Sequence, residues 1–183
     1  KKVILLLLLS HYSFSQITQI GADIDGEAAL DYSGYSVSLS SDGSIAAIGA
    51  LNNDGIGNNS GHVRVYQFNI ANSSWTRIGW DIDGEAPDDH SGRSVSLSSD
   101  GSIVAIGAYG NDGNGDNSGH VRVYEWDDSS WNQLGDDIDG EAAEDYSGYS
   151  VSLSSDGSIV AIGAHKNDGN GENSGHVRVY QFN

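Results

Sequence analysis

The chain has 183 residues, of which 26 are acidic and only 8 are lysine or arginine, so its formal net charge is −18. This charge argues against binding to nucleic acid or to an anionic membrane surface, because both are themselves negatively charged. The sequence contains no cysteine, so it offers no site for a disulfide bond or for a thioether-linked lipid.

The first fifteen residues resemble a targeting segment. Lys1 and Lys2 precede the apolar run 3–9, and small and polar residues follow up to Ser15. A positive start, a short apolar run and a small-residue site are typical of a secretory signal peptide, and the run is too short to cross a membrane. We predict cleavage after Ser15 and an extracellular or cell-surface location. A buried N-terminal strand is the alternative.

The rest of the chain consists of copies of one unit. A phrase that reads Asp-Ile-Asp-Gly-Glu starts at Asp23, Asp81 and Asp137, so the unit recurs after 58 and then 56 residues. We refer to these three segments as the acidic phrases. A fixed period of this length indicates a repeat architecture.

Each unit is predicted to contain four short strands. In the first copy, residues 36–39 alternate polar and apolar side chains, and 45–50 is a run of small and branched apolar residues. An Asp-Gly pair between these two segments is typical of a hairpin turn. Residues 62–66 and 75–78 supply the third and fourth strands. Four antiparallel strands per unit predict an all-β fold in which each unit is one blade of a β-propeller.

The predicted domain organisation follows from these units. We expect blade 1 at residues 25–82, blade 2 at 83–138, and blade 3 at 139–183 without its own fourth strand. Residues 16–24 are similar to the fourth-strand segments, so we expect an outer strand there that completes the last blade.

The blades are expected to stack on one another. Both faces of segment 45–50 are apolar, so a single blade would leave one face in water. Three blades are fewer than the four to eight of most propellers. Two alternatives follow: the chain is a piece of a longer propeller, or two chains form a homo-oligomeric six-bladed ring through their open blade faces.

The sequence of the repeat resembles that of a known family. In the third copy it reads SGYSVSLS, then SIVAIGA, then GHVRVYQF, which is similar to the FG-GAP repeat of integrin α-chain propellers and of many secreted bacterial proteins. Ser-Gly at 33–34, 91–92 and 147–148 stands where the family has Phe-Gly. Gly-Ala at 49–50, 107–108 and 163–164 matches its Gly-Ala-Pro, with Leu51, Tyr109 and His165 in place of the proline.

The resemblance covers the chain from about residue 16 onward and implies a propeller fold. It does not carry over the family's calcium site, which lies in an Asp-rich loop between the first two strands of a blade. Here that connection, residues 40–43, is too short to wrap a cation.

Two other acidic loops supply oxygen ligands. The first lies in the acidic phrases and includes Asp23, Asp25 and Asp31. The second follows the second strand and alternates oxygen side chains with glycines; its candidate ligands are Asp112, Asn114 and Asp116 in the second unit, and Asp168, Asn170 and Glu172 in the third. Such loops suit Ca²⁺, which is therefore the candidate cofactor. The alternative is that Asp, Asn and Gly form tight turns there.

Basic residues and histidines recur in register. Arg64, Arg122 and Arg178 each lie in mid-strand, and we predict that each forms an ion pair with an acid of an acidic phrase. His62, His120 and His176 begin the same strands. Because equivalent positions on different blades lie around a ring, we interpret these histidines as structural. Carboxylates that recur in every blade single out no active centre, so we expect no catalytic activity.

A candidate binding face is formed by aromatic and cationic residues. Tyr35, Arg93 and Tyr149 share one repeat position, and Tyr109 and His165 share another. We predict that Tyr35, Arg93 and Tyr149 line one mouth of the propeller channel. Tyr109 and His165 are further candidates for the binding face. The favoured function is a secreted binding or adhesion module for a glycan or protein partner. Structural self-assembly is the alternative, and a carbohydrate-active hydrolase is less favoured.

Overall fold

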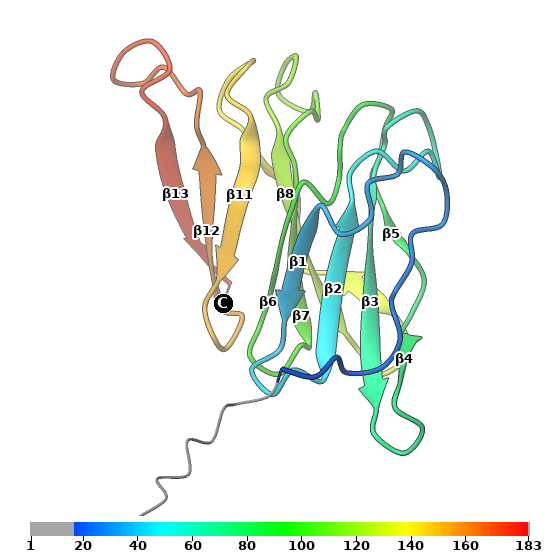
Figure 1. Ribbon diagram of the computed structural model, residues 1–183. Helices are drawn as coiled ribbons and strands as arrows, with labels where there is room; N and C mark the ends of the chain where they lie inside the picture. The colour runs from blue at the N-terminus through cyan, green and yellow to red at the C-terminus, as the bar shows by residue number, and fades with distance from the viewer. Residues whose placement is uncertain (1–16, 183) are drawn as a thin grey trace, which may run out of the picture.

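Residues 17–182 are described by a computed structural model, in which they form three antiparallel sheets standing side by side (Figure 1). The predicted signal peptide at 1–15 lies outside these residues. None of the described residues forms a helix that is long and apolar enough to span a membrane.

Each sheet corresponds to one repeat, which confirms the prediction of an all-β fold built from antiparallel propeller blades. Blade 1 contains β1 (Ser36–Leu39), β2 (Ile45–Ala50), β3 (His62–Asn69), β4 (Ser74–Arg77) and β5 (Ile82–Asp83). Blade 2 contains β6 (Ser94–Leu97), β7 (Ile103–Ala108), β8 (His120–Trp126), β9 (Trp131–Gln133) and β10 (Ile138–Asp139). Blade 3 contains β11 (Ser147–Leu153), β12 (Ile159–Ala164) and β13 (His176–Gln181).

The fourth strand of a blade is broken in two. In blade 1, β4 pairs with the C-terminal half of β3, and β5 pairs with its beginning, where Val63 lies opposite Ile82. Gly79, between β4 and β5, has a φ of +73°, which favours glycine. A Cβ at Gly79 would lie 2.8 Å from the Trp131 side chain of blade 2. The break therefore makes room for the next blade, and Asp83 joins the sheet of blade 1 although blade 2 was expected to begin there.

Neighbouring blades pack through their first strands, since β6 contacts both β1 and β11. The Ser36 hydroxyl donates a hydrogen bond to the Gly92 carbonyl at 2.7 Å, and Ser94 donates in the same way to Gly148 at 2.8 Å. A Cβ at Gly49 would lie only 2.2 Å from the Gly92 carbonyl oxygen. Glycine on β2 is therefore required for this close approach.

Apolar side chains fill the space between blades. Val63 and Val65 of blade 1 form one core cluster with residues of blade 2, including Val104 and Ile106. An equivalent cluster joins blade 2 to blade 3. Burial removes apolar surface from water and is the main stabilising term of such a stack.

The two outer faces of the array are open. Val63, Val121 and Val177 occupy the same repeat position, and their exposed fractions are 0%, 0% and 66%. On the opposite face of the array, Val37 and Leu39 of β1 are also exposed. The same side chains are therefore buried wherever a neighbouring blade is present.

Residues 17–24 lie against blade 1 and form no strand. The Trp75 indole donates a hydrogen bond to the Ile20 carbonyl at 3.0 Å, just as Trp131 in blade 2 donates to Ile78 at 3.2 Å. The segment thus stands where the fourth strand of a preceding blade would stand. The expected completion of blade 3 is not observed, because blade 3 lies at the other end of the array (Figure 1).

Candidate functional site: the aromatic end of the blades

The five residues of the predicted binding face lie together at one end of the sheets. The Arg93 guanidinium carbon is 3.8 Å from the ring centroid of Tyr149 and 4.9 Å from that of Tyr35. The Tyr149 ring centroid is 4.2 Å from that of His165 and 5.7 Å from that of Tyr109. We call this cluster of Tyr35, Arg93, Tyr109, Tyr149 and His165 the aromatic end.

The antiparallel pairing of the first two strands explains this arrangement. Ser36 lies opposite Gly49, so a residue just before the first strand and a residue just after the second share one end of the hairpin. The same register recurs in blades 2 and 3. Stacking then brings equivalent ends of successive blades next to one another.

Three further side chains extend the aromatic end. His90 stacks on Tyr109 with ring centroids 5.0 Å apart and an interplanar angle of 2°. Tyr146 lies 5.6 Å from Tyr109, and the Lys166 ammonium nitrogen is 4.2 Å from the Tyr146 ring centroid. Sequence reasoning missed these residues. The available signal was an aromatic or imidazole ring three residues before each of Tyr35, Arg93 and Tyr149.

The turns that carry these rings have an unusual backbone. Tyr32, His90 and Tyr146 have φ values of 54°, 55° and 54°, in the left-handed region that bulky residues rarely adopt. Residues held in such conformations cluster at binding sites, and surrounding bonds must hold them there.

Buried aspartates supply those bonds. The Asp89 carboxylate accepts hydrogen bonds from the backbone N–H groups of Glu85 and Ala86 and from the Asn111 side chain, at 3.0 to 3.2 Å. Asp31 and Asp145 are buried in the same way in the other blades. These aspartates belong to the first acidic loop, and their contacts fix the turn next to the aromatic end.

Charge also shapes the aromatic end. Burial lowers the pKa of His165, and the nearby Lys166 and Arg93 lower it further. The imidazole is therefore neutral at neutral pH and stacks as an uncharged ring. Burial raises the pKa of the Tyr109 phenol, which stays protonated. Arg93 and Lys166 remain as the two cationic groups of the surface.

The predicted calcium ligands lie on exposed loops that are held by hydrogen bonds within the loop and, for Asn114, by bonds to the third acidic phrase. Asp112 accepts a bond from the backbone N–H of Asn117 at 2.8 Å, and Asn114 donates its amide to the Gly140 carbonyl at 2.8 Å. Asp116 accepts a bond from the Asn117 side chain.

In the third unit, Asp168 accepts a bond from the backbone N–H of Asn173, the backbone N–H of Asn170 donates to Ser174, and Glu172 is exposed. Bonds of this kind are those of tight turns. Calcium binding at these loops stays a prediction.

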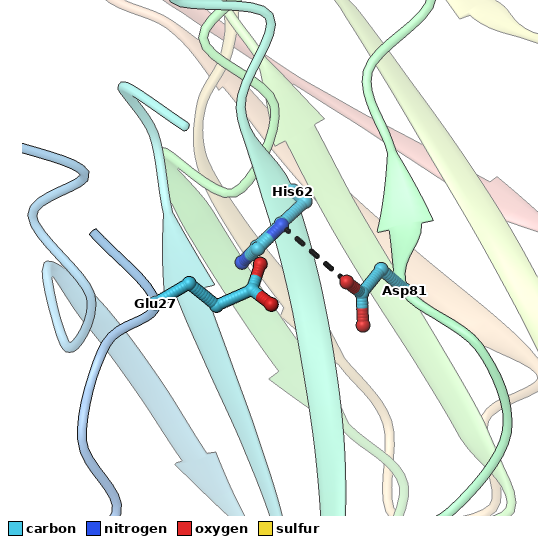
Figure 2. A group of neighbouring side chains, drawn as sticks. All are labelled: Glu27, His62 and Asp81. Carbon is cyan, nitrogen blue, oxygen red and sulfur yellow. Dashed lines mark ion pairs between the residues drawn. The ribbon is translucent and has the colours of Figure 1, made fainter. Parts of the chain in front are cut away.

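A second group of side chains lies where the acidic phrases meet the third strands. Glu27, His62 and Asp81 converge there (Figure 2). The His62 Nδ1 atom is 3.9 Å from an Asp81 oxygen. Arg64 holds Asp81 with two hydrogen bonds of 3.0 and 3.1 Å and also pairs with Glu27. Burial opposes ionisation of Asp81, but Arg64 outweighs it and lowers the pKa of that carboxyl.

The other two units show related contacts. Arg122 lies 3.4 Å from Glu85, and Arg178 lies 4.0 Å from Glu141. Each of the three arginines therefore contacts the glutamate of the acidic phrase that precedes its own blade.

Comparison with known proteins identifies two of the repeats. Residues 82–124 and 138–180 each match the FG-GAP repeat. Among curated proteins, none is significantly similar to this sequence.

Solved structures share the fold. A candidate 6-phosphogluconolactonase from Bacteroides uniformis is 15% identical with a TM-score of 0.54, over 81% of this chain and 36% of that one. The periplasmic gluconolactonase of Pseudomonas aeruginosa is 20% identical with a TM-score of 0.53, over 80% of this chain and 38% of that one. The chain thus spans less than two fifths of the length of either structure. With two matching repeats, antiparallel blades and this shared fold, the chain contains FG-GAP repeats that form blades of a β-propeller.

Proposed function

We propose that the chain is a carbohydrate-binding module of a secreted or cell-surface protein, and that the aromatic end is its contact surface. The observation that carries the proposal is Arg93, which lies over the rings of both Tyr35 and Tyr149. Ligand sites combine aromatic surface with a few well-placed polar groups. A sugar offers C–H faces for the rings and oxygens for the guanidinium donors.

The distribution of charge favours an acidic sugar. Arg64, Arg77, Arg122 and Arg178 pair with carboxylates of the chain. Arg93 and Lys166 form no ion pair with another described residue and lie over tyrosine rings instead. On a protein of net charge −18, these two cations favour a ligand with carboxylate or sulfate groups, because charge-assisted hydrogen bonds are the stronger ones.

Binding to a glycan array that contains neutral, uronic and sulfated polysaccharides tests this proposal. We expect retention of acidic polysaccharides, lost in Arg93→Ala and in Tyr149→Ala. Arg77→Ala, which removes an arginine away from the aromatic end, is the matched control and should bind like the wild type. If no glycan binds, or if Arg93→Ala binds unchanged, the proposal is wrong.

We favour binding over catalysis because the carboxylates recur in every unit. The two similar structures named above are described as gluconolactonases, so hydrolysis of gluconolactone is the reaction to assay. Turnover that survives purification and is lost in a variant of the aromatic end would replace the binding proposal with an enzymatic one.

Self-assembly is the second candidate, favoured by the exposed valines of β13 and the exposed Val37 and Leu39 of β1. Apolar faces of this kind are the faces that other blades bury, so a second copy fits there. Light scattering at several concentrations measures the mass. Val179→Asp should abolish any association, and a monomeric wild-type chain at every concentration rejects this candidate.

A further inference from the structure

The second unit contains a cluster that differs from its counterpart in Figure 2. His120 of β8 is 1% exposed, and its Nδ1 atom has no hydrogen-bond partner. This atom faces Glu85 Oε2 at 3.8 Å and Asp137 Oδ2 at 3.7 Å. Both distances exceed those of hydrogen bonds. A buried polar atom without a protein partner is rare in a native fold, and an ion, a water or a ligand can supply the partner.

Each carboxylate at this cluster has one oxygen already engaged. Glu85 Oε1 lies 3.4 Å from Arg122, and Asp137 Oδ1 accepts a hydrogen bond of 2.7 Å from the Gln133 side chain. The other oxygen of each is the one that faces His120. Partners that hold the outer atoms of ligating groups are typical of metal sites, because they fix the orientation of the ligands.

Comparison with the first unit shows which charge is absent. There, Asp81 is held by Arg64 through both oxygens and by Arg77 at 2.5 Å. Two arginines thus balance the carboxylates of Glu27 and Asp81. In the second unit the residue equivalent to Arg77 is the neutral Gln133. Among the described residues, Arg122 is the one arginine that pairs with an acid of this cluster, and it pairs with Glu85. The second cluster therefore lacks one positive charge relative to the first.

We propose that Glu85, His120 and Asp137 bind a divalent transition-metal ion, with zinc as the ion that best fits these ligands. One imidazole nitrogen and two carboxylate oxygens suit zinc, whose bonds to such atoms are about 2.0–2.2 Å. Calcium is a poor fit because it takes six to eight oxygen ligands. The three ligand atoms lie within 4.8 Å of one another, so a small closure of the exposed Glu85 side chain completes the contacts.

The surroundings support this assignment. Burial and the nearby Arg122 lower the pKa of His120, so the imidazole is uncharged at neutral pH. A neutral imidazole is the form that ligates metals. Glu85 and Asp137 are 44% and 31% exposed, which leaves the ion a path from solvent. From the sequence, the histidines are interpreted as structural because three equivalent positions on different blades cannot meet at one metal ion. That interpretation did not consider the acids that lie beside each histidine.

Isothermal titration of Zn²⁺ into chelator-treated protein tests the proposal. A background of millimolar Ca²⁺ occupies weak sites on the acidic surface. We expect one Zn²⁺ per chain, with the affinity reduced at least tenfold in His120→Ala. The second variant, Gln133→Arg, restores the arginine that blade 1 carries at this position. It should also reduce affinity about 10–100-fold, the range found when groups around metal ligands are changed.

His62→Ala is the control, because its cluster is already balanced by two arginines, and it should bind Zn²⁺ like the wild type. Circular dichroism establishes that each variant is folded, and visible absorption of bound Co²⁺ reports on the ligand set. The proposal is overturned by a wild-type chain without a saturable site. It is equally overturned by unchanged affinity in both His120→Ala and Gln133→Arg, or by loss of the site in His62→Ala.

Discussion

Arg93 of blade 2 lies over the ring of Tyr149 in blade 3, with its guanidinium carbon 3.8 Å from the ring centroid. The contact crosses a blade interface, so the proposed binding surface exists only where blades are stacked. It also keeps a long, flexible cation in a fixed place, which reduces the entropy that a ligand must overcome on binding.

Removing this cation should affect binding far more than stability. In Arg93→Ala, the two partly exposed cation–π contacts with Tyr35 and Tyr149 are lost, and each costs about 0.5–1 kcal/mol of unfolding free energy. A melting curve should show this small change, whereas retention on an acidic polysaccharide should disappear. A large loss of stability would instead show that Arg93 mainly holds blades 2 and 3 together.

Glycine at the blade interface should be irreplaceable in the middle of the stack. A Cβ at Gly107 would lie 2.0 Å from the Gly148 carbonyl oxygen and 2.5 Å from Ser94 Oγ. We expect Gly107→Ala to lower the free energy of unfolding by at least the roughly 1–3 kcal/mol typical of overpacking, measured by urea denaturation.

Gly163→Ala is the matched control for this prediction. Gly163 occupies the same position in blade 3, where an added Cβ meets Ser150 Oγ at 2.4 Å but no neighbouring blade. It should cost less than Gly107→Ala. Equal losses in the two variants would show that the serine, and not the next blade, sets the requirement.

Arg122 should contribute to stability through its buried contacts. Its side chain is 8% exposed and donates a 2.6 Å hydrogen bond to the Asp83 carbonyl, besides its pair with Glu85. Because Glu85 is partly exposed and screened, we expect Arg122→Ala to cost about 1–3 kcal/mol, the range for leaving a buried polar group unsatisfied. Arg77→Ala, at a more exposed position, should stay within about 1 kcal/mol of the wild type. An unchanged melting temperature in Arg122→Ala would contradict this role.

The hairpin aspartates should make the protein sensitive to acid. Hydrogen bonds from Ser44 and Ser40 lower the pKa of Asp42 from 3.8 to about 2, and hydrogen bonds from Ser154 and Ser158 do the same for Asp156. A lowered pKa in the folded state stabilises the protein above pH 3.8, and this stabilisation is lost as the pH falls toward 2. The double variant Asp42→Asn/Asp156→Asn should lose less stability between pH 4 and 2 than the wild type, in urea titrations. An identical slope would show that other carboxyls dominate.

Calcium should raise the melting temperature if the loops after the second strands bind it. The predicted shift is lost in a variant that combines Asp112→Ala with Asp168→Ala, since each aspartate is the first oxygen ligand of its loop. If millimolar Ca²⁺ does not change the melting temperature of the wild-type chain, the loops are tight turns and do not bind calcium.

The repeat made most of the blade architecture predictable. Ser36 and Gly49 are assigned to neighbouring strands, and the repeat period predicts the same pairing in blades 2 and 3. This pairing places Tyr35, Arg93 and Tyr149 at the same end of the sheets. The break between β4 and β5 was not predicted. The break lies against Trp131 of the next blade, and contacts between blades are not encoded within one strand's pattern.

The clusters around His62 and His120 could also not be predicted from the sequence. Each takes a glutamate from before its blade and an aspartate from the break in that blade's fourth strand, so more than fifty residues separate the two acids. In the first unit Arg64 holds Asp81, whereas in the second unit His120 Nδ1 has no partner between the two acids. This difference depends on side-chain positions. The sequence shows that Gln133 occupies the repeat position of Arg77. Its effect on the charge balance of the cluster becomes clear only from the distances to Asp81 and Asp137.

The hydrogen bond from Ser36 to Gly92 and that from Ser94 to Gly148 show that both blade junctions use one set of complementary atoms. A tandem duplication of one unit would thus yield a sheet that already matches its neighbours on both sides. Recombination that adds or removes a whole unit would therefore need no new contact between blades.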